Sequence, residues 1–357
     1  MGNLQKNCLS NRVKWRTGKV VGLGILAVIV ILLPVVVPSP YYIHLLIMVG
    51  INAVLAMTFI LLLRTGLITI AVAAFWGIGA YASALLVLRL DLPFWLALPV
   101  STIITGIIAL LVGYVMVRRG GIGFVIQTLV FAFIISLVFG TFDVFGGYSG
   151  IYNIPRPEPI FLPFLDPIEF TSKTPYYYLM LFLVLLVVLA FSAFYAAWTG
   201  RAWRAIGLSP RLAESLGVNL FRYRILAFVI ASAAAGLMGS FFAHYYGSIV
   251  PGTFGPFKTI YVHVYAILGG IGFAFFGPLI GSFIMTIVPE ILRITKEVEP
   301  IVTGLVIILL VMFLPDGLLG LSSSWRRPPA PAENMARIAR WIRASLPANR
   351  VDSEKRK

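Results

Sequence analysis

The side chains of this chain that could do chemistry are few and lie far apart. The three histidines, His44, His244 and His263, are distant from one another in the sequence and from the only cysteine, Cys8. No cluster of residues has the spacing of a metal site, and no phosphate-binding loop of the form G-x-x-x-x-G-K-[ST] is present. No Ser, His and Asp constellation can be assembled either. The sequence therefore predicts that the chain is not an enzyme and holds no cofactor or metal of its own.

The elements that carry these residues are long apolar segments. Of the 357 residues, 60% are hydrophobic and 11% are charged, whereas about a quarter of a soluble domain is charged. Apolar runs of at least 18 residues recur, and each can cross a hydrocarbon layer about 30 Å thick. Because a lipid-exposed backbone must satisfy its own hydrogen bonds, we expect an all-α integral membrane protein. The predicted spans are 20–37, 42–63, 67–88, 93–117, 122–142, 176–198, 224–246 and 300–321, with 259–292 still to be divided.

The stretch 259–292 is too long for one ordinary crossing, since 34 helical residues would measure about 51 Å. Glycines and a proline interrupt it at Gly272–Pro278. Two short crossings give about ten transmembrane helices, some of them broken by Gly or Pro, with both termini on one side. That side collects 22 of the 28 Lys and Arg residues, so the positive-inside rule makes it cytoplasmic. Nine spans would place the basic tail outside, and a tilted or re-entrant segment is an alternative.

This topology divides the chain into a basic cytoplasmic N-terminus (1–19), a transmembrane domain (20–321) and a basic cytoplasmic tail (322–357). An outside loop spans 143–175 and a cytoplasmic loop spans 199–223. The outside loop, rich in Pro and Gly, is a lid over a pathway, a docking surface or a solvated connector. The tail forms an interfacial helix on anionic lipid or stays disordered. The net charge of +15 indicates topology and membrane lipid rather than nucleic acid, because the basic residues are scattered between spans.

One short polar segment inside the cytoplasmic loop has the pattern of a capped helix. Ser209 suits the N-cap, Pro210 suits the first helical position, and Gly217 suits the end of the helix. Such a helix could present its side chains to another protein or lie on lipid headgroups. The candidate docking residues are Ser209, Pro210, Arg211, Leu212, Ala213, Glu214, Ser215, Leu216 and Gly217.

Small residues gather at two stretches within the apolar segments. They serve close helix packing, or they form the wall of a transport pathway, where glycine-broken helices are tolerated. The middles of the spans carry no Asp, Glu, Lys or Arg, so transport would take its energy from outside the membrane or be passive. The candidate pathway residues are Ala73, Ala74, Phe75, Gly77, Gly79, Tyr81, Gly269, Gly270, Gly272, Gly277, Pro278 and Gly281.

Three of these segments together resemble a known family, the membrane permeases of branched-chain amino acid ABC importers, and its M-type subunit in particular. Residues 213–217 match the family's A-E-A-L-G-type element, with Ser215 in place of an alanine. Residues 66–86 resemble its G-L-x-S-x-G-x-A-A-F-x-G-I-G-A-Y segment, and 265–284 resemble its L-G-G-x-G-x-x-x-G-P-x-x-G segment. The chain departs from the family at 69–72, where Thr-Ile-Ala-Val replaces a frequent Ser-Leu-Gly-His, so its solute could differ.

The resemblance implies a permease subunit in the bacterial inner membrane that carries branched-chain or related amino acids. It implies four partners: a second homologous permease, two ATP-binding-cassette ATPases that hold ATP and magnesium, and an extracytoplasmic solute-binding protein. Residues 209–217 would be the coupling helix that docks on an ATPase. The alternatives are an importer for urea or short amides, or an ATP-independent facilitator of small neutral solutes. A membrane-embedded enzyme or scaffold is disfavoured by the missing catalytic constellation.

Overall fold

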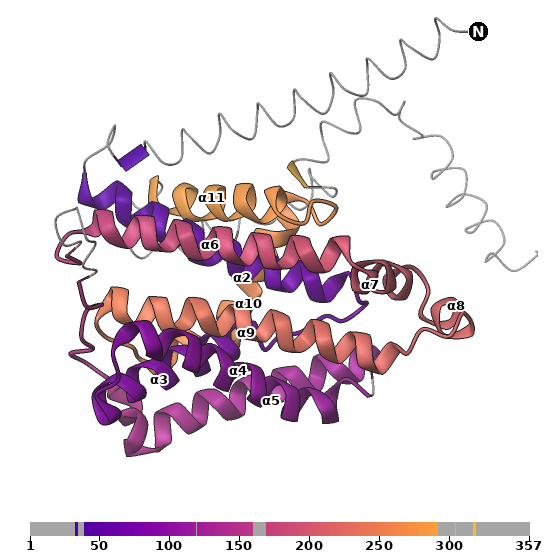
Figure 1. The fold of residues 1–357 in the computed structure, drawn as a ribbon, viewed down its shortest axis with the longest axis horizontal. Coiled ribbons are helices and arrows are strands. Elements are labelled where there is room, and N and C mark those ends of the chain that lie inside the picture. Colours follow the sequence, from indigo (N-terminus) through magenta and orange to yellow (C-terminus); the bar gives the residue numbers. More distant parts are fainter. Residues whose placement is uncertain are drawn as a thin grey trace, which may run out of the picture.

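Long apolar helices lying side by side form the body of the protein (Figure 1). The computed structural model describes residues 33–34, 39–118, 120–159, 169–291, 304 and 317–318. The predicted spans 20–37 and 300–321 lie almost wholly outside the described residues, and both terminal segments, 1–19 and 322–357, lie wholly outside them. The helices are α2 (Pro40–Leu63), α3 (Val72–Leu90), α4 (Phe94–Met116), α5 (Gly121–Thr141), α6 (Lys173–Ala196), α7 (Trp198–Leu208), α8 (Pro210–Ser215), α9 (Leu220–Tyr246), α10 (Pro256–Gly269) and α11 (Phe276–Ile291), with short 3-10 helices η1 (Asp143–Phe145), η2 (Gly147–Ser149) and η3 (Pro251–Phe254).

Six of these helices are long and apolar enough to cross a membrane: α2, α3, α4, α5, α6 and α9. The predicted all-helical membrane fold is confirmed for the described residues, which contain no β-strand beyond one isolated bridge, Ile151 to Ile249. The largest boundary error is at the start of α3, which begins at Val72 rather than at residue 67. Gly66, at a φ of +72°, turns the chain there, and the Thr69 carbonyl accepts a hydrogen bond from His263 Nε2 at 2.9 Å instead of joining a helix.

Helix α2 occupies the centre of the bundle. It packs against α6, α9, α10 and α11, and 83% of its most apolar 18-residue window is buried. The corresponding windows of α4, α5 and α6 are only 28% buried. The exposed sides of these three helices are apolar, including Leu111, Ile126 and Phe182, as surfaces in contact with lipid or with another membrane protein must be.

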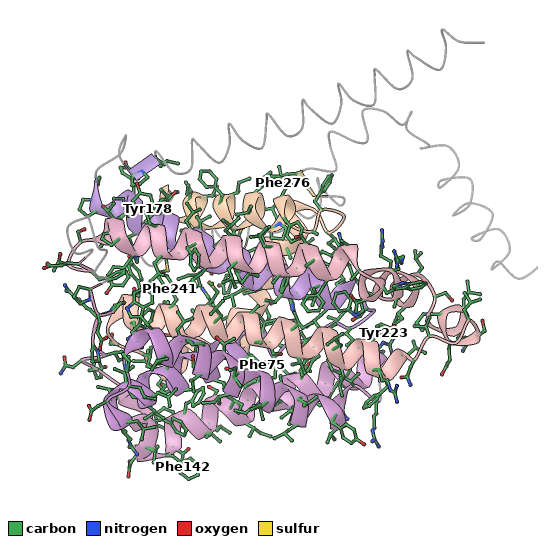
Figure 2. The ribbon with its side chains drawn as sticks, in the orientation of Figure 1. Phe75, Phe142, Tyr178, Tyr223, Phe241 and Phe276 are labelled. Carbon is green, nitrogen blue, oxygen red and sulfur yellow. The ribbon has the colours of Figure 1, made fainter. Side chains whose placement is uncertain are left out.

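Helices α3 and α9 are held together by small residues. A Cβ added to Gly79 would overlap the backbone of Gly236, and one added to Gly239 would overlap the carbonyl of Trp76. Aromatic rings fill the space around this contact; Phe75, which Figure 2 labels within the bundle, packs against Phe131 and Phe228 at ring distances of 5.3 Å. The close approach explains why these positions are glycine, since any side chain would separate the helices.

The predicted division of 259–292 into two helices is confirmed. Helices α10 and α11 pack side by side, and the break between them covers 270–275. Backbones touch where Gly269 meets Gly277 and where Gly281 meets Tyr265, so the two helices run antiparallel. Pro278 lies in the first turn of α11 rather than in the break, where its missing N–H costs no helical hydrogen bond.

A segment ahead of α10 turns back into the bundle. After α9 ends at Tyr246, η3 places the ring of Phe254 against Gly77 and 5.8 Å from that of Tyr81. Gly77 is 13 residues before the end of α3 at Leu90, a distance of about 20 Å along the helix. Helix α10 therefore begins inside the bundle, three residues before the predicted start of the apolar stretch at 259.

The long loop after α5 is fastened to the same region. Ile151 and Ile249 exchange backbone hydrogen bonds of 2.9 Å, and the Ile154 N–H donates to the Gly247 carbonyl. A buried chain of hydrogen bonds supports this contact: Ser240 donates to Ser83, Ser83 donates to His244 Nε2, and His244 Nδ1 donates to the Pro155 carbonyl at 2.7 Å. His244 is thus a satisfied structural residue. The described part of the loop is attached to the bundle rather than free.

Candidate functional site

Helix α8 has the caps that its sequence predicts. The Ser209 side chain accepts a hydrogen bond from the Leu212 N–H at 3.4 Å, and Pro210 is the first helical residue. The helix covers Pro210–Ser215, so it begins at the predicted residue and ends one residue before the predicted Leu216. Gly217 has a φ of +82°, a left-handed conformation that favours glycine after a helix. Asn219 then caps α9 by accepting from the Arg222 N–H at 3.0 Å.

The surface of α8 faces away from the rest of the protein. The helix projects beyond α7 at one end of the bundle (Figure 1). Leu212 and Leu216 are 61% and 74% exposed, and Glu214 is exposed beside them. Only Ala213 is buried. Two exposed leucines beside a carboxylate are the features expected of a helix that inserts into a groove on another protein.

Helix α7 fixes the position of α8, and it is absent from the sequence prediction, which left 199–208 as loop. Its Trp203 is fully buried, donates from its indole Nε1 to the Tyr223 carbonyl at 2.8 Å, and packs between Phe194 and Tyr195. Figure 2 labels Tyr223 near this end of the bundle. The signal for α7 was the amphipathic spacing of Ala202, Trp203 and Ile206, the buried side of the helix.

Arg224 joins α8 to the loops between the long helices. Its Nε donates to the Thr65 carbonyl at 3.2 Å, and its two terminal nitrogens lie beside Gly66 and Gly120. It also shares with Glu214 an open groove of about 500 Å³, within which the two opposite charges attract each other. One side chain therefore contacts the α2–α3 and α4–α5 connections and the α8 region.

Charge is distributed unequally between the two ends of the bundle. The end that carries α8, which we call the α8 end, is strongly basic, and the opposite end, which we call the loop end, is mixed. At the α8 end the described charged residues are Arg64, Arg118, Arg201, Arg204, Arg211, Arg222, Arg224 and Glu214; at the loop end they are Arg89, Arg156, Lys173, Asp91, Asp143, Glu158 and Glu169.

The candidate pathway residues of the first stretch lie in the interior of the bundle. Ala73 donates its N–H to Thr259 Oγ1 at 3.0 Å, and Ala74 is fully buried beside Phe75. Gly77 contacts Phe254, while Gly79 contacts Gly236. Tyr81 stacks on Phe139 at 4.1 Å. Packing accounts for each of these residue types, and their place on a pathway stays a prediction.

The second stretch forms the α10–α11 turn. Gly269, Gly277 and Gly281 provide the close helix contacts, and Gly270 has a φ of +108°. The Gly272 carbonyl accepts from Arg64 at 3.3 Å, which places the turn at the α8 end. The two predicted stretches meet through α10, whose Thr259 and His263 bond to Ala73 and Thr69.

Sequence reasoning missed a large cavity inside the bundle. It measures about 560 Å³ and is lined by residues of α2, α3, α9, α10, α11 and the 247–255 segment. Its lining includes Lys258 and Glu290; the sequence placed Lys258 just before the stretch 259–292 and Glu290 at its end. The available signal was the closely spaced Pro251, Gly252, Gly255 and Pro256, which is unusual for a simple connector. The described residues form no cluster suited to a metal ion.

Comparison with known proteins agrees with this architecture. The profile of the family described as "Branched-chain amino acid transport system / permease component" matches residues 41–314. The chain is 27% identical to the high-affinity branched-chain amino acid transport system permease protein LivM of Escherichia coli K12, over 82% of this chain and 71% of that protein. The LivM protein of Salmonella typhimurium is 28% identical over 78% of this chain and 68% of its own length.

A shorter similarity links the chain to a second permease. The LivH protein of Escherichia coli K12 is 33% identical over 34% of this chain and 39% of its own length. No solved structure matches the chain. Since the family profile covers well over half of the sequence and six helices can span a membrane, this chain is a multi-pass protein of the bacterial inner membrane that belongs to the permease components of branched-chain amino acid transport systems.

Proposed function

We propose that this chain is one permease subunit of an ATP-binding-cassette importer and that it forms, with a second homologous permease, the pathway for branched-chain or related amino acids. The observation that carries the proposal is α8, a capped helix that presents Leu212, Glu214 and Leu216 to the outside of the molecule. The similarity to both LivM and LivH supports a partner permease of related sequence.

The α8 end of the bundle is the cytoplasmic end in this proposal. Seven arginines and one glutamate gather there among the described residues, whereas basic and acidic residues nearly balance at the loop end. This asymmetry follows the positive-inside rule. With one span on each side of the described helices, and α10 and α11 as a pair, about ten spans bring both termini to the cytoplasm.

The partners follow from this orientation. Two ATPase subunits, which bind ATP and magnesium, dock at the cytoplasmic end, and one of them receives α8 in a groove. An extracytoplasmic solute-binding protein delivers the solute at the loop end. In this proposal the ATPases hold the nucleotide and the metal, and the part of this chain in the cycle is to transmit movement and to enclose the solute.

Movement of α8 would reach the bundle by two routes. One runs through α7, whose Trp203 is locked to the Tyr223 carbonyl at the start of α9. The other runs through Arg224, which holds the Thr65 carbonyl beyond the end of α2. The backbones of α3 and α9 are in direct contact at Gly79 and Gly236. We therefore expect α3 and α9 to move as one body. Such rigid-body motion is how alternating access is commonly achieved, provided that the partners bind the two states differently.

The test is a charge reversal on α8. Glu214→Arg places a cation in a groove that already holds Arg118 and Arg224, and it removes the carboxylate offered to a partner. We expect the tagged variant to insert in the membrane and copurify with the second permease, but to lose the ATPases and ATP-driven uptake. Asp143→Arg, the same reversal at the loop end, is the matched control and should retain the ATPases.

Three results would contradict the proposal. Normal ATPase recovery and uptake with Glu214→Arg would remove α8 from the coupling role. Equal loss of the ATPases in Glu214→Arg and Asp143→Arg would show that the effect is not specific to α8. Solute uptake by the wild-type chain alone, without ATP or partner proteins, would establish a facilitator.

A further inference from the structure

The open groove beside α8 connects charged side chains to the lipid-facing surface of the bundle. It measures about 500 Å³ and lies where α4 ends and α9 begins, with Arg118, Glu214, Phe221 and Arg224 among its lining residues. Figure 1 shows α4 and α5 on the side of the bundle away from α11. The groove therefore lies beside two helices whose outer surfaces are mostly exposed and apolar.

Exposed apolar side chains of α4 and α5 lead up to this groove. They recur every three or four residues, so on each helix they share one side. They are Ile107, Leu111, Tyr114 and Val115 on α4, and Ile122 and Ile126 on α5. Arg118 continues the α4 spacing, two residues beyond the end of that helix at Met116. A cation that ends an apolar stripe lies where the acyl chains of a lipid give way to its headgroup.

Aromatic rings hold Arg118 in position. Its guanidinium carbon lies 4.3 Å from the centre of the Tyr114 ring and 5.5 Å from the centre of the Phe221 ring. Among the described residues Arg118 has no hydrogen bond or ion pair. The N–H donors at the edge of the guanidinium plane are therefore available to an acceptor, and a phosphate matches their planar fork.

Arg224 supplies the second cation of the groove from α9. Its Nε donates to the Thr65 carbonyl at 3.2 Å, and one terminal nitrogen lies 3.3 Å from the position that a Cβ would take on Gly120. Gly120 precedes α5, which has no side-chain cap, so the positive end of that helix dipole adds to the charge of Arg224. Glu214 is the one acid among the described lining residues. Arg118, Arg224 and Glu214 together carry two positive charges and one negative charge, a net +1.

We propose that this groove binds the headgroup of an anionic phospholipid such as phosphatidylglycerol. The phosphodiester, which carries a single negative charge, binds Arg118 and Arg224 and neutralises the net charge of the groove. The acyl chains lie on the exposed apolar stripe of α4 and α5. Phosphatidylethanolamine has no net charge, so it leaves the net +1 of the groove uncompensated and binds more weakly.

A lipid at this position touches the residues that connect α8 to the bundle. The phosphate and Glu214 compete for the Arg224 guanidinium, so lipid binding leaves the Glu214 carboxylate available to a partner of α8. This consequence, and the placement of the groove in the cytoplasmic leaflet, rest on the proposed function. The lipid site itself rests on Arg118, Arg224 and the apolar stripe.

Native mass spectrometry of the purified transporter, together with its copurifying subunits, tests the proposal. The complex is delipidated in detergent and titrated with phosphatidylglycerol or with phosphatidylethanolamine, and the apparent dissociation constant of the first bound lipid is measured. We expect phosphatidylglycerol to bind more tightly than phosphatidylethanolamine. Millimolar inorganic phosphate should not displace it, because inorganic phosphate has no acyl chains to lie on the stripe.

Three variants locate the site. Arg118→Gln should weaken phosphatidylglycerol binding by about fivefold, the contribution of one arginine near a membrane surface. Arg201→Gln is the matched control and should bind like the parent, because Arg201 lies the same 4.3 Å from an aromatic ring, that of Trp198, but does not line the groove. Glu214→Gln removes the competing carboxylate and should tighten binding severalfold, a gain that misfolding cannot produce.

The proposal is overturned if the two phospholipids bind equally, or if Arg118→Gln binds phosphatidylglycerol like the parent. Equal weakening by Arg118→Gln and Arg201→Gln would show diffuse attraction to a basic surface, and displacement by inorganic phosphate would show a site for free phosphate. Recovery of the ATPases with Glu214→Arg is a separate measurement. Its failure would refute the coupling role and leave the Arg118 effect in place, so the two failures are distinguishable.

Discussion

Replacing Trp203 with alanine tests whether α7 is the support that holds α8 in place. Trp203 is fully buried and its indole donates to the Tyr223 carbonyl at 2.8 Å. Removing a buried Trp side chain costs about 3–5 kcal/mol, and the carbonyl left without its donor adds to this. The local opening of α7 should therefore become at least about 100-fold more frequent, since 1.36 kcal/mol corresponds to a factor of ten.

Trp198→Ala is the matched control in the same helix. Trp198 is 76% exposed, and its ring contact with Arg201, at 4.3 Å, lies at the surface. An exposed contact of this kind is worth about 0.5–1 kcal/mol, so opening should rise by no more than about fivefold. The two variants remove the same side chain from one helix and differ only in burial and hydrogen bonding.

The assay is amide hydrogen exchange of the transporter in nanodiscs, followed over residues 199–217. Exchange in this segment should be much faster in Trp203→Ala, while exchange in α3 and α9 beyond the first turn stays near the parent rate. ATP-driven uptake should fall with it. If Trp203→Ala and Trp198→Ala accelerate exchange equally, α7 is not the support that we describe, and movement of α8 must reach the bundle elsewhere.

Two further predictions concern the packing of α9. Gly79→Ala places a methyl group against the Gly236 backbone and should lower the thermal midpoint of the purified protein by the equivalent of about 1–3 kcal/mol. Gly106→Ala is the control and should not lower it, because the added carbon would meet Ala233 at an ordinary 3.7 Å. Equal midpoints for the two variants would refute the close-packing argument. His244→Phe removes the hydrogen bond to the Pro155 carbonyl and should speed exchange of the loop amides at 151–154 by about tenfold, and unchanged exchange there would show that the loop is held by its backbone bonds alone.

Much of the fold could be predicted because a helix that crosses a lipid bilayer must be long and apolar, and both properties can be read from the sequence. Length and apolar composition indicated the six long helices, and the glycines at 269–277 indicated the break between α10 and α11. The caps of α8 were readable because Ser209, Pro210 and Gly217 act locally, within one turn of the helix. Local signals of this kind need no knowledge of the neighbouring helices.

The cavity could not be predicted, because it depends on contacts between distant segments. Lys258 looks like a residue of an outside loop until η3 is seen to pack on Gly77, and Glu290 looks like a span-end residue until α11 is placed beside α10. The start of α3 was placed five residues too early for a similar reason. The apolar composition of 67–71 suits a helix, but the Thr69 carbonyl is bonded to His263, 194 residues away.

The central position of α2 has a consequence for the order in which the protein is made. Four of the helices that surround it, α6, α9, α10 and α11, emerge from the ribosome after it, so a newly inserted α2 is first surrounded by lipid. The mean hydropathy of its most apolar 18-residue window is 2.6, which suits a helix that is surrounded by lipid until the later helices are inserted. Asn52, near the middle of the helix, is a polar residue whose partner Thr286 is synthesised 234 residues later. Until α11 is inserted, the Asn52 amide must stay unpaired in hydrocarbon or donate to another acceptor. Insertion of α11 therefore supplies the hydrogen-bond acceptor for this side chain of α2.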